Sequence, residues 1–336
     1  MKFLSVCSGI EAASVAWHPL GWESVAYSEI EPFPCKVLQH HYPAVPNLGD
    51  MTKFKEWPDA DVDVFVGGTP CQSFSVAGLR KGLDDPRGNL MLTYLAIAKR
   101  YRPNWLVWEN VPGVLSSNGG RDFGSLLGGL AVLGYGFAYR VLDAQYFGVA
   151  QRRRRVFVVG YLGDWRPAAA ILFERHSLQG HPAPSREKGQ RPTASTSASP
   201  VYGGSDPNTS DTVTSKWAKG SGGPAGNECG LFVAQPIAFS GQMSNPQTDV
   251  DMTQTLQAKN PMAVAQAMAV RRLSCVECER LQGFPDRYTD IQPKGKATPD
   301  GPRYKALGNS MAVPVMAWIG KRIQEVDAIC KTQQNT

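Results

Sequence analysis

Short apolar runs rich in β-branched residues alternate with amphipathic stretches from residue 2 to about residue 162. The runs have the length of strands, and the stretches between them repeat apolar residues at roughly helical spacing. Such alternation is typical of a parallel sheet covered by helices on both faces. The pattern predicts an α/β fold with a doubly wound, mostly parallel sheet. The predicted strands are 2–6, 23–29, 62–68, 105–111, 138–144 and 155–162, and the predicted helices are 13–20, 32–42, 89–101 and 123–134.

The composition changes after this region. Residues 175–265 are rich in Gly, Pro, Ser, Thr, Asn and Gln, so we expect loops, a small irregular module or partial disorder there. Ser274 and Glu277 form a capping-box pattern that predicts a short helix ending at Gly283, and residues 311–326 are again amphipathic. We therefore expect three parts: 1–174, 175–265 and 266–336.

The composition also limits the class of protein. Seven scattered cysteines do not resemble a secreted disulfide framework, so we expect reduced thiols and a cytoplasmic protein. The sequence shows no signal-peptide core and no apolar run long enough to span a membrane. A formal net charge of +6 favours an anionic partner, with nucleic acid the leading candidate.

A cysteine stands at the exit of one predicted strand, in the stretch GGTPCQSFSVAG of residues 67–78. A cysteine kept for packing belongs inside an apolar run, whereas Cys71 lies on a turn shaped by glycine and proline, where a substrate can reach it. A thiol protease needs a histidine base, and none of the five histidines occurs in a recognisable catalytic pattern. Cys71 is therefore a candidate nucleophile of another kind.

Polar and charged residues mark three further strand ends. Glu109 and Asn110 end the apolar run WLVW, at the edge where open parallel sheets bind ligands. A desolvated Glu109 has a raised pKa and can donate a proton. Four arginines precede the run VFVVGYL, and strand alternation puts Arg153 and Arg155 on one side. The turn SVCSG, with Glu29 and Asp50 downstream, suits close approach of a ligand that carries ribose.

Together these segments resemble the cytosine-C5 DNA methyltransferase family. SVCSG, GGTPCQSFS, ENV, QRRRR, RRLSCVECERLQGFPD and ALGNSMAVP stand in the order of that family's motifs and cover most of the chain outside residues 175–265. The resemblance implies a variable target-recognition region at 175–265, followed by an arginine-rich helix. It leaves Cys275 and Cys278 as helix packing rather than zinc ligands, since a lone CxxC has no second ligand pair.

The resemblance also implies a mechanism and a set of site residues. Cys71 would add to C6 of a flipped cytosine, Glu109 would protonate N3, and Arg153 and Arg155 would hold the base and the nucleophile loop. S-adenosyl-L-methionine would supply the methyl group. The implied cofactor-binding residues are Cys7, Ser8, Gly9, Ile10, Glu29, Ile30, Asp50, Met51, Pro70, Asn309 and Ser310.

The implied partner is double-stranded DNA, and we expect a monomer near the nucleoid. The sequence names neither the recognised DNA sequence nor a restriction endonuclease partner. One departure stands out: Cys7 and Glu11 replace an aromatic residue and a second glycine that are usual in the first motif. Two alternatives stay open, namely an RNA cytosine methyltransferase on the same scaffold and a catalytically silent DNA-binding protein.

Overall fold

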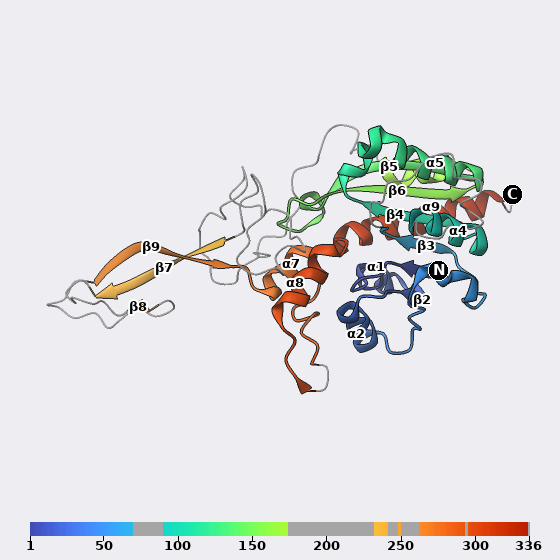
Figure 1. Ribbon diagram of the computed structural model, residues 1–336. Helices are drawn as coiled ribbons and strands as arrows, with labels where there is room; N and C mark the ends of the chain where they lie inside the picture. Colours follow the sequence, from blue (N-terminus) through green and yellow to red (C-terminus); the bar gives the residue numbers. More distant parts are fainter. Residues whose placement is uncertain (70–89, 174–231, 241–247, 250–261, 293–294, 335–336) are drawn as a thin grey trace.

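The computed structural model describes residues 1–69, 90–173, 232–240, 248–249, 262–292 and 295–334 (Figure 1). A six-stranded sheet is its centre, in the order β2-β1-β3-β4-β6-β5. The pairs β2-β1, β1-β3 and β3-β4 are parallel, and β6 runs antiparallel to both neighbours. The predicted α/β class is confirmed, as a mixed sheet. The strands are β1 (Lys2–Val6), β2 (Glu23–Ser28), β3 (Val64–Gly67), β4 (Trp105–Asn110), β5 (Tyr135–Asp143) and β6 (Arg154–Leu162).

Helices cover both faces of this sheet (Figure 1). The α-helices are α1 (Ala12–Trp17), α2 (Pro32–His41), α4 (Leu90–Tyr101), α5 (Arg121–Val132), α6 (Arg166–Leu172), α7 (Cys275–Gln282), α8 (Asp300–Asn309) and α9 (Val313–Gln334). The 3₁₀ turns are η1 (His18–Leu20), η2 (Met51–Glu56), η4 (Pro112–Leu115), η5 (Ser117–Gly120) and η6 (Ala144–Phe147).

Side-chain alternation along the strands builds two separate cores. In β4, Trp105 and Val107 belong to the core that includes α1, α6 and α9, whereas Leu106 and Trp108 belong to the core that includes α4 and α5. Successive strand residues point to opposite faces, and here both faces are covered. This is why WLVW is apolar without interruption.

The C-terminal helix returns to the start of the chain. The indole of Trp17 in α1 donates to the carbonyl of Met316 in α9 at 2.7 Å, and the indole of Trp105 in β4 donates to Asp327 at 3.0 Å. Gly320 lies where any Cβ would meet the Trp17 ring at 2.4 Å, so the two helices approach closely. These contacts fix α9, and with it the segment that precedes it, against the sheet.

The structure departs from the predicted helices at three places. The predicted helix 13–20 is divided, because α1 ends at Trp17 and Pro19 falls within η1. Helix α8 was not predicted, since Gly301 and Pro302 in its first turn favour a loop reading. The predicted arginine-rich helix begins only at Cys275, after the cap Ser274, so Arg271 and Arg272 lie in a strand instead.

A second sheet lies within and beyond the predicted recognition region. Strands β7 (Phe232–Ser240), β8 (Thr248–Asp249) and β9 (Met262–Arg272) pair antiparallel in the order β8-β7-β9, and Figure 1 shows β7 and β9 extending away from the main sheet. The composition did not predict these strands, because their Ala and Gln have weak strand preference. Pro236 coincides with a break in register between Gln235 and Ile237. The rest of 175–265 lies outside the described residues.

The predicted capping box is present. Ser274 accepts from the amide of Glu277, the Glu277 carboxylate accepts from the amide of Ser274, and Gly283 ends α7 in the left-handed conformation. Cys275 and Cys278 are buried in α7 and pack in the core, as the packing interpretation requires.

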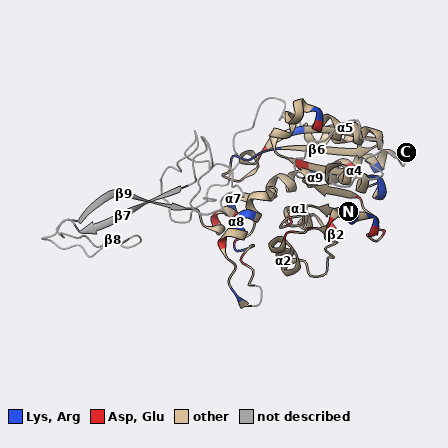
Figure 2. Cartoon of the chain, viewed as in Figure 1, with Lys and Arg blue, Asp and Glu red and all other residues tan. Residues whose placement is uncertain are grey.

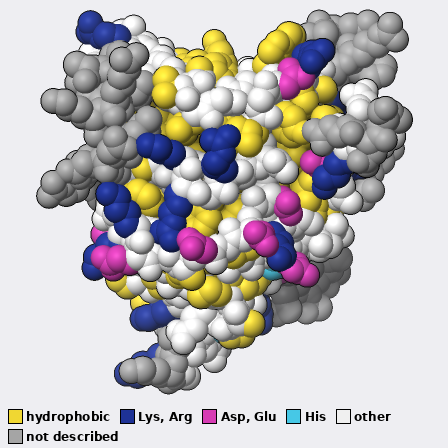
Figure 3. All heavy atoms as spheres, turned by 90° about the vertical axis from the view of Figure 1, so that its right-hand side faces the viewer, with side chains coloured by type: hydrophobic (Ala, Val, Ile, Leu, Met, Phe, Trp, Pro, Cys, Tyr) yellow, Lys and Arg dark blue, Asp and Glu magenta, His cyan; other side chains and the backbone are white. Residues whose placement is uncertain are grey.

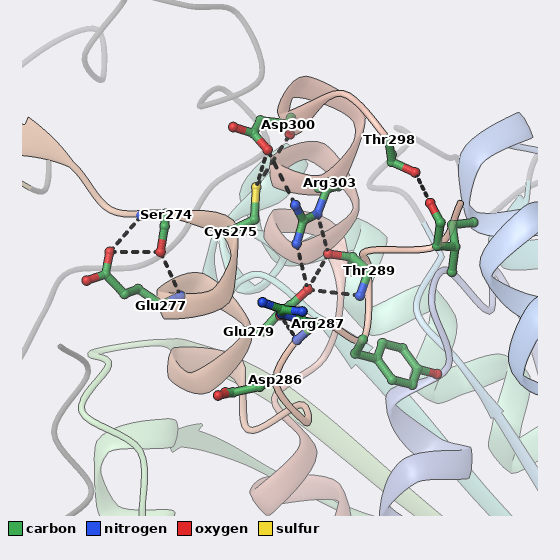
Figure 4. A network of polar contacts seen from close by, with 12 residues as sticks. Ser274, Cys275, Glu277, Glu279, Asp286, Arg287, Thr289, Thr298, Asp300 and Arg303 are labelled. Carbon is green, nitrogen blue, oxygen red and sulfur yellow. Dashed lines mark hydrogen bonds and ion pairs between the residues drawn. The ribbon is translucent and has the colours of Figure 1, made fainter. Parts of the chain in front are cut away.

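A buried network fixes the loop after α7 (Figure 4). The carboxylate of Glu279, fully buried, accepts from the amide of Arg287 at 2.6 Å, from the amide and hydroxyl of Thr289, and from the guanidinium of Arg303 at 3.3 Å. The loop thereby brings Tyr288 to the first motif, where its hydroxyl donates to the carbonyl of Ile10 at 2.9 Å. A buried side chain from the C-terminal part of the sequence thus supports the turn after β1.

Charged side chains are distributed unevenly. Figure 2 shows basic residues at the left end of β6 and around α7 and α8. Figure 3 views the right-hand end of the molecule, where basic and acidic side chains lie close together. The net positive charge is therefore not collected on that end. None of the helices in the described residues combines the length and apolar character needed to cross a bilayer.

Replacing Glu279 by Ala should lower the free energy of unfolding by about 3 to 5 kcal/mol, because it leaves the buried Arg303 guanidinium with the exposed Asp300 as its only carboxylate partner among the described residues and removes the acceptor of the Arg287 and Thr289 amides. The control is Lys305→Ala, which removes an exposed ion pair with Glu31 and should cost about 1 kcal/mol at most. Urea denaturation followed by circular dichroism measures both. Equal losses in the two variants would contradict a supporting role for the network.

Candidate active site

The strand directions bring the predicted site residues to one edge of the sheet. Strands β1, β2, β3 and β4 are parallel, so their carboxyl ends share that edge. Strand β6 is reversed, and its amino end therefore lies at the same edge. Glu109, near the end of β4, and Arg155, near the start of β6, come from opposite strand ends and still meet.

Glu109 and Arg155 form an ion pair. The Nε of Arg155 lies 3.2 Å from Oε1 of Glu109, and the two side chains are only 15% and 12% exposed. Burial raises the pKa of the Glu109 carboxyl, while the guanidinium groups of Arg155 and Arg153 act in the opposite direction. The raised pKa agrees with the prediction. Gly68 allows this approach, because a Cβ there would lie 3.0 Å from Oε2 of Glu109.

The predicted alternation of the arginine run is confirmed. Arg153 and Arg155 point into the protein, whereas Arg152 and Arg154 are exposed. The guanidinium of Arg153 donates to the carbonyls of Gly308 at 3.1 Å and Ser310 at 2.6 Å. Arg153 therefore ties the end of α8 to the start of β6.

Asn110 holds the strand exit that leads to the candidate nucleophile. Its amide donates to the carbonyl of Thr69 at 2.8 Å, and the indole of Trp108 donates to the Thr69 hydroxyl at 3.0 Å. Thr69 is the last described residue before Pro70 and Cys71, which lie outside the described residues. Two side chains of β4 thus position the entry to that segment.

A pocket opens at this edge between the turn after β1 and the end of α8. It holds about 400 Å³ of empty space, which includes its open mouth. Its lining includes the predicted acid Glu109 and five of the predicted cofactor residues, namely Cys7, Ser8, Gly9, Asn309 and Ser310. Its described lining is Ser5, Cys7, Ser8, Gly9, Glu11, Ala12, Ala13, Val66, Gly68, Glu109, Asn309, Ser310 and Met311.

The other predicted cofactor residues that the structure describes lie outside that lining. The Glu29 carboxylate accepts from the amides of Gly9 at 2.7 Å, Ile30 at 2.8 Å and Glu31 at 2.7 Å, which ties β2 to the first motif. The neighbouring Ile30 is 68% exposed, an apolar surface that suits a flat ring.

Three more of the predicted cofactor residues have structural roles of their own. Asp50 caps η2 through the amide of Thr52, and Met51 is buried. The side chain of Ile10 is fully buried in the core, so only its backbone can face a ligand. The combination of left-handed Gly9, acceptor carboxylates and an exposed aliphatic side chain fits a ribose-bearing cofactor.

Comparison with known proteins agrees with this geometry. The family model described as C-5 cytosine-specific DNA methylase matches residues 1–325. The chain belongs to this family.

Curated relatives of this chain include proteins of phage and bacteria. A protein of Escherichia phage P1 named DNA N-6-adenine-methyltransferase is 36% identical over an alignment of 469 residues, which covers 99% of this chain; the chain spans 62% of that protein's length. The type II methyltransferase M2.BsuMI of Bacillus subtilis (strain 168) is 29% identical, with 97% of this chain and 76% of the relative covered.

Solved structures support the fold. The crystal structure of the S. pombe Dnmt2 methyltransferase aligns with a TM-score of 0.64 at 17% identity, over 97% of this chain and 98% of that one. The six-stranded sheet therefore has the fold of a methyltransferase.

Two residues of the pocket have properties that the sequence did not indicate. Burial, together with Glu29, raises the pKa of the Cys7 thiol to about 12, so Cys7 is not a thiolate near neutral pH. Glu11 was noted only as a departure from the family pattern, yet it lines the pocket. No sequence signal indicated its left-handed backbone, with φ of 63°, because that conformation is rare outside glycine, asparagine and aspartate.

Replacing Arg155 by Met should raise the pKa of Glu109 further, because it removes the largest of the influences that lower it while burial remains. Titration by ¹³C NMR of protein labelled at glutamate carboxyls measures this, with Glu109→Gln identifying the resonance. Arg154→Met is the matched control, since Arg154 is exposed on the other side of the strand. An unchanged Glu109 titration in Arg155→Met would contradict the electrostatic coupling.

Proposed function

We propose that the chain is a DNA (cytosine-5-)-methyltransferase that methylates C5 of a flipped cytosine in duplex DNA through a covalent adduct of Cys71. The observation that carries this proposal is the buried Glu109–Arg155 pair beside the strand exit that leads to Cys71. Membership of the cytosine methylase family supports it.

Each proposed role answers a chemical difficulty. C5 of cytosine is a poor nucleophile, and addition of the Cys71 thiolate at C6 turns the ring into an enamine when Glu109 donates a proton to N3. After methyl transfer a base removes the C5 proton, and the C6–S bond breaks to return the thiolate. Burial, which raises the pKa of Glu109, favours the protonated acid that this step needs.

The two arginines position the catalytic groups, and the pocket residues would bind the methyl donor. Arg155 orients the Glu109 carboxyl, and Arg153 joins the end of α8 to the same edge. Ser8, Gly9, Glu29, Ile30, Asp50, Asn309 and Ser310 would hold S-adenosyl-L-methionine, which supplies an electrophilic methyl group when bound. The target base must leave the stack, at a cost of a few kcal/mol, so the enzyme also has to stabilise the open strand.

The substrate is the part of the proposal that most needs a direct test. The name of the phage P1 relative points to adenine in the case of that protein, and an RNA substrate remains the alternative on the same scaffold. In our proposal the acceptor is double-stranded DNA, and the activity belongs in the cytoplasm, at the nucleoid.

Purified protein given S-adenosyl-L-methionine should form 5-methylcytosine in duplex DNA, and Cys71→Ser should form none, because a hydroxyl is far less ionised than a thiol near neutral pH. Nucleoside mass spectrometry of DNA and tRNA substrates distinguishes 5-methylcytosine from N6-methyladenine. DNA with 5-fluorocytosine at the target should remain bound to wild-type protein on a denaturing gel. N6-methyladenine as the sole product, or methylation of tRNA alone, would overturn the proposal.

We also propose that residues 175–265, with the flanking arginine-rich stretch at 270–284, select the DNA sequence. Strand β9 crosses the end of this region and leads through Leu273 into α7, so it connects the region to the catalytic edge. Polar side chains in the region are suited to contacts with base edges and phosphates.

Replacing residues 175–265 by a short flexible linker should preserve S-adenosyl-L-methionine binding and abolish sequence-selective methylation. Calorimetry measures the first property, and sequencing of methylated cytosines in a methylation-free host measures the second. The intact chain serves as control. A trimmed protein that methylates the same sites with the same preference would place recognition elsewhere.

A further inference from the structure

Glu11 is a pocket residue that the usual family pattern does not explain. Its side chain is 1% exposed, and its backbone has φ of 63° and ψ of 60°. A non-glycine residue in the left-handed region costs about 1 to 2 kcal/mol, and burial of a carboxylate adds to this cost. Such strain is retained where surrounding structure or function requires it. The pocket lining includes Glu11, so a role toward the ligand of the pocket can account for the strain.

Helix capping accounts for only part of what Glu11 does. Its Oε2 accepts from the amide of Ser14 at 3.0 Å and from the Ser14 hydroxyl at 2.5 Å, which caps α1. Neutral Ser or Asn side chains cap equally well, and glycine would relieve the backbone strain. The cap therefore explains an acceptor at this position but not a negative charge.

The charges around the pocket favour a cationic ligand. Its described lining contains two ionisable acids, Glu11 and Glu109, and no Lys, Arg or His. Glu109 is offset by Arg155. For Glu11, the neighbouring charge among the described residues is Glu29, which disfavours ionisation. A positively charged ligand would supply the compensation that Glu11 lacks within the described part of the chain.

We infer that Glu11 is a specificity-determining residue, the negative charge that makes the pocket prefer the sulfonium methyl donor over its neutral thioether product. This inference rests on the proposed function. Donor and product, S-adenosyl-L-methionine and S-adenosyl-L-homocysteine, differ only in one methyl group and one positive charge. Contacts to ribose or adenine stabilise both ligands equally and cannot distinguish them. A buried carboxylate does so, because charges interact more strongly where water is excluded.

A chain of hydrogen bonds gives Glu11 a route for its proton. The Ser14 hydroxyl lies 2.8 Å from the Tyr27 hydroxyl, which donates to Ser24 at 2.8 Å, and Ser24 lies 2.8 Å from Nε2 of His18. His18 is exposed. Every hydroxyl and the imidazole can both donate and accept, so a proton from Glu11 passes to Ser14, each group in the chain passes its own proton to the next, and one proton leaves from His18.

The groups around Glu11 determine whether its carboxyl holds or loses its proton. Burial raises its pKa, Ser14 and Ser5 offset this through hydrogen bonds, and Glu29 adds to the increase. Tyr27, Tyr42 and Tyr288 also face it, and burial keeps these three phenols neutral. A bound cation favours the carboxylate, so donor binding expels a proton that product binding leaves in place.

Isothermal titration calorimetry of both ligands tests the inference. At about pH 8 the Glu11→Gln variant, which keeps a cap acceptor and its volume, should lose about ten-fold of the wild-type preference for donor, through weaker donor binding alone. Asp50→Asn is the matched control, since it removes a carboxylate from the same edge and should change both affinities together. Repeating the titrations at about pH 6 in buffers of different ionisation enthalpy counts the protons released.

Wild-type protein should release more protons with donor than with product, and Glu11→Gln should abolish the difference. An unchanged preference in Glu11→Gln would reduce Glu11 to a helix cap and overturn the inference. If that variant does not fold, the wild type decides, because equal proton release with both ligands overturns the inference alone. Binding of neither ligand to wild-type protein would overturn the proposed function with it.

Discussion

The antiparallel pairing of β6 with β4 is the constraint on which the active edge depends. Its register places Phe157 opposite Glu109 and Val156 opposite Asn110, so Arg155 lies just beyond the end of β4. Had β6 run parallel to its neighbours, its arginines would lie at the far edge, about 20 Å away for a six-residue strand. Reversing one strand therefore brings cations to an edge where parallel strands end in acids.

The buried ion pair at this edge orients the Glu109 carboxyl rather than stabilising the fold. Removing two charges from water costs about as much as their attraction returns, so Glu109 and Arg155 are weak evidence for a stabilising contact. Burial of the Arg153 guanidinium also costs desolvation free energy, and its hydrogen bonds to the carbonyls of Gly308 and Ser310 offset this cost. These carbonyls come from the end of α8, and α9 packs against α1 behind them. The last part of the chain is therefore structurally part of the first.

The sequence predicted the elements whose signals are local. Each run of the main sheet matched a strand, and Ser274, Glu277 and Gly283 marked the ends of α7 because caps act through neighbouring backbone groups. It did not predict features that depend on distant contacts. Helix α8 begins with Asp300, Gly301 and Pro302, and it is held by Arg303 against Glu279, a pairing across 24 residues. Asn309 is the last residue of this helix.

The same distinction applies within the site. Strand alternation was enough to separate Arg153 and Arg155 from their exposed neighbours, since it is a property of any strand. The environments of three carboxyl groups at one edge could not be inferred this way. Glu29 is held by three amides, Glu109 by a guanidinium, and Glu11 by one amide together with hydroxyl groups. Amides and a guanidinium favour a carboxylate strongly, whereas a serine hydroxyl serves either protonation state. Glu11 accepts from a single amide, against three for Glu29, and its hydroxyl partners serve the carboxyl as well as the carboxylate, so its charge can change with the occupant of the pocket.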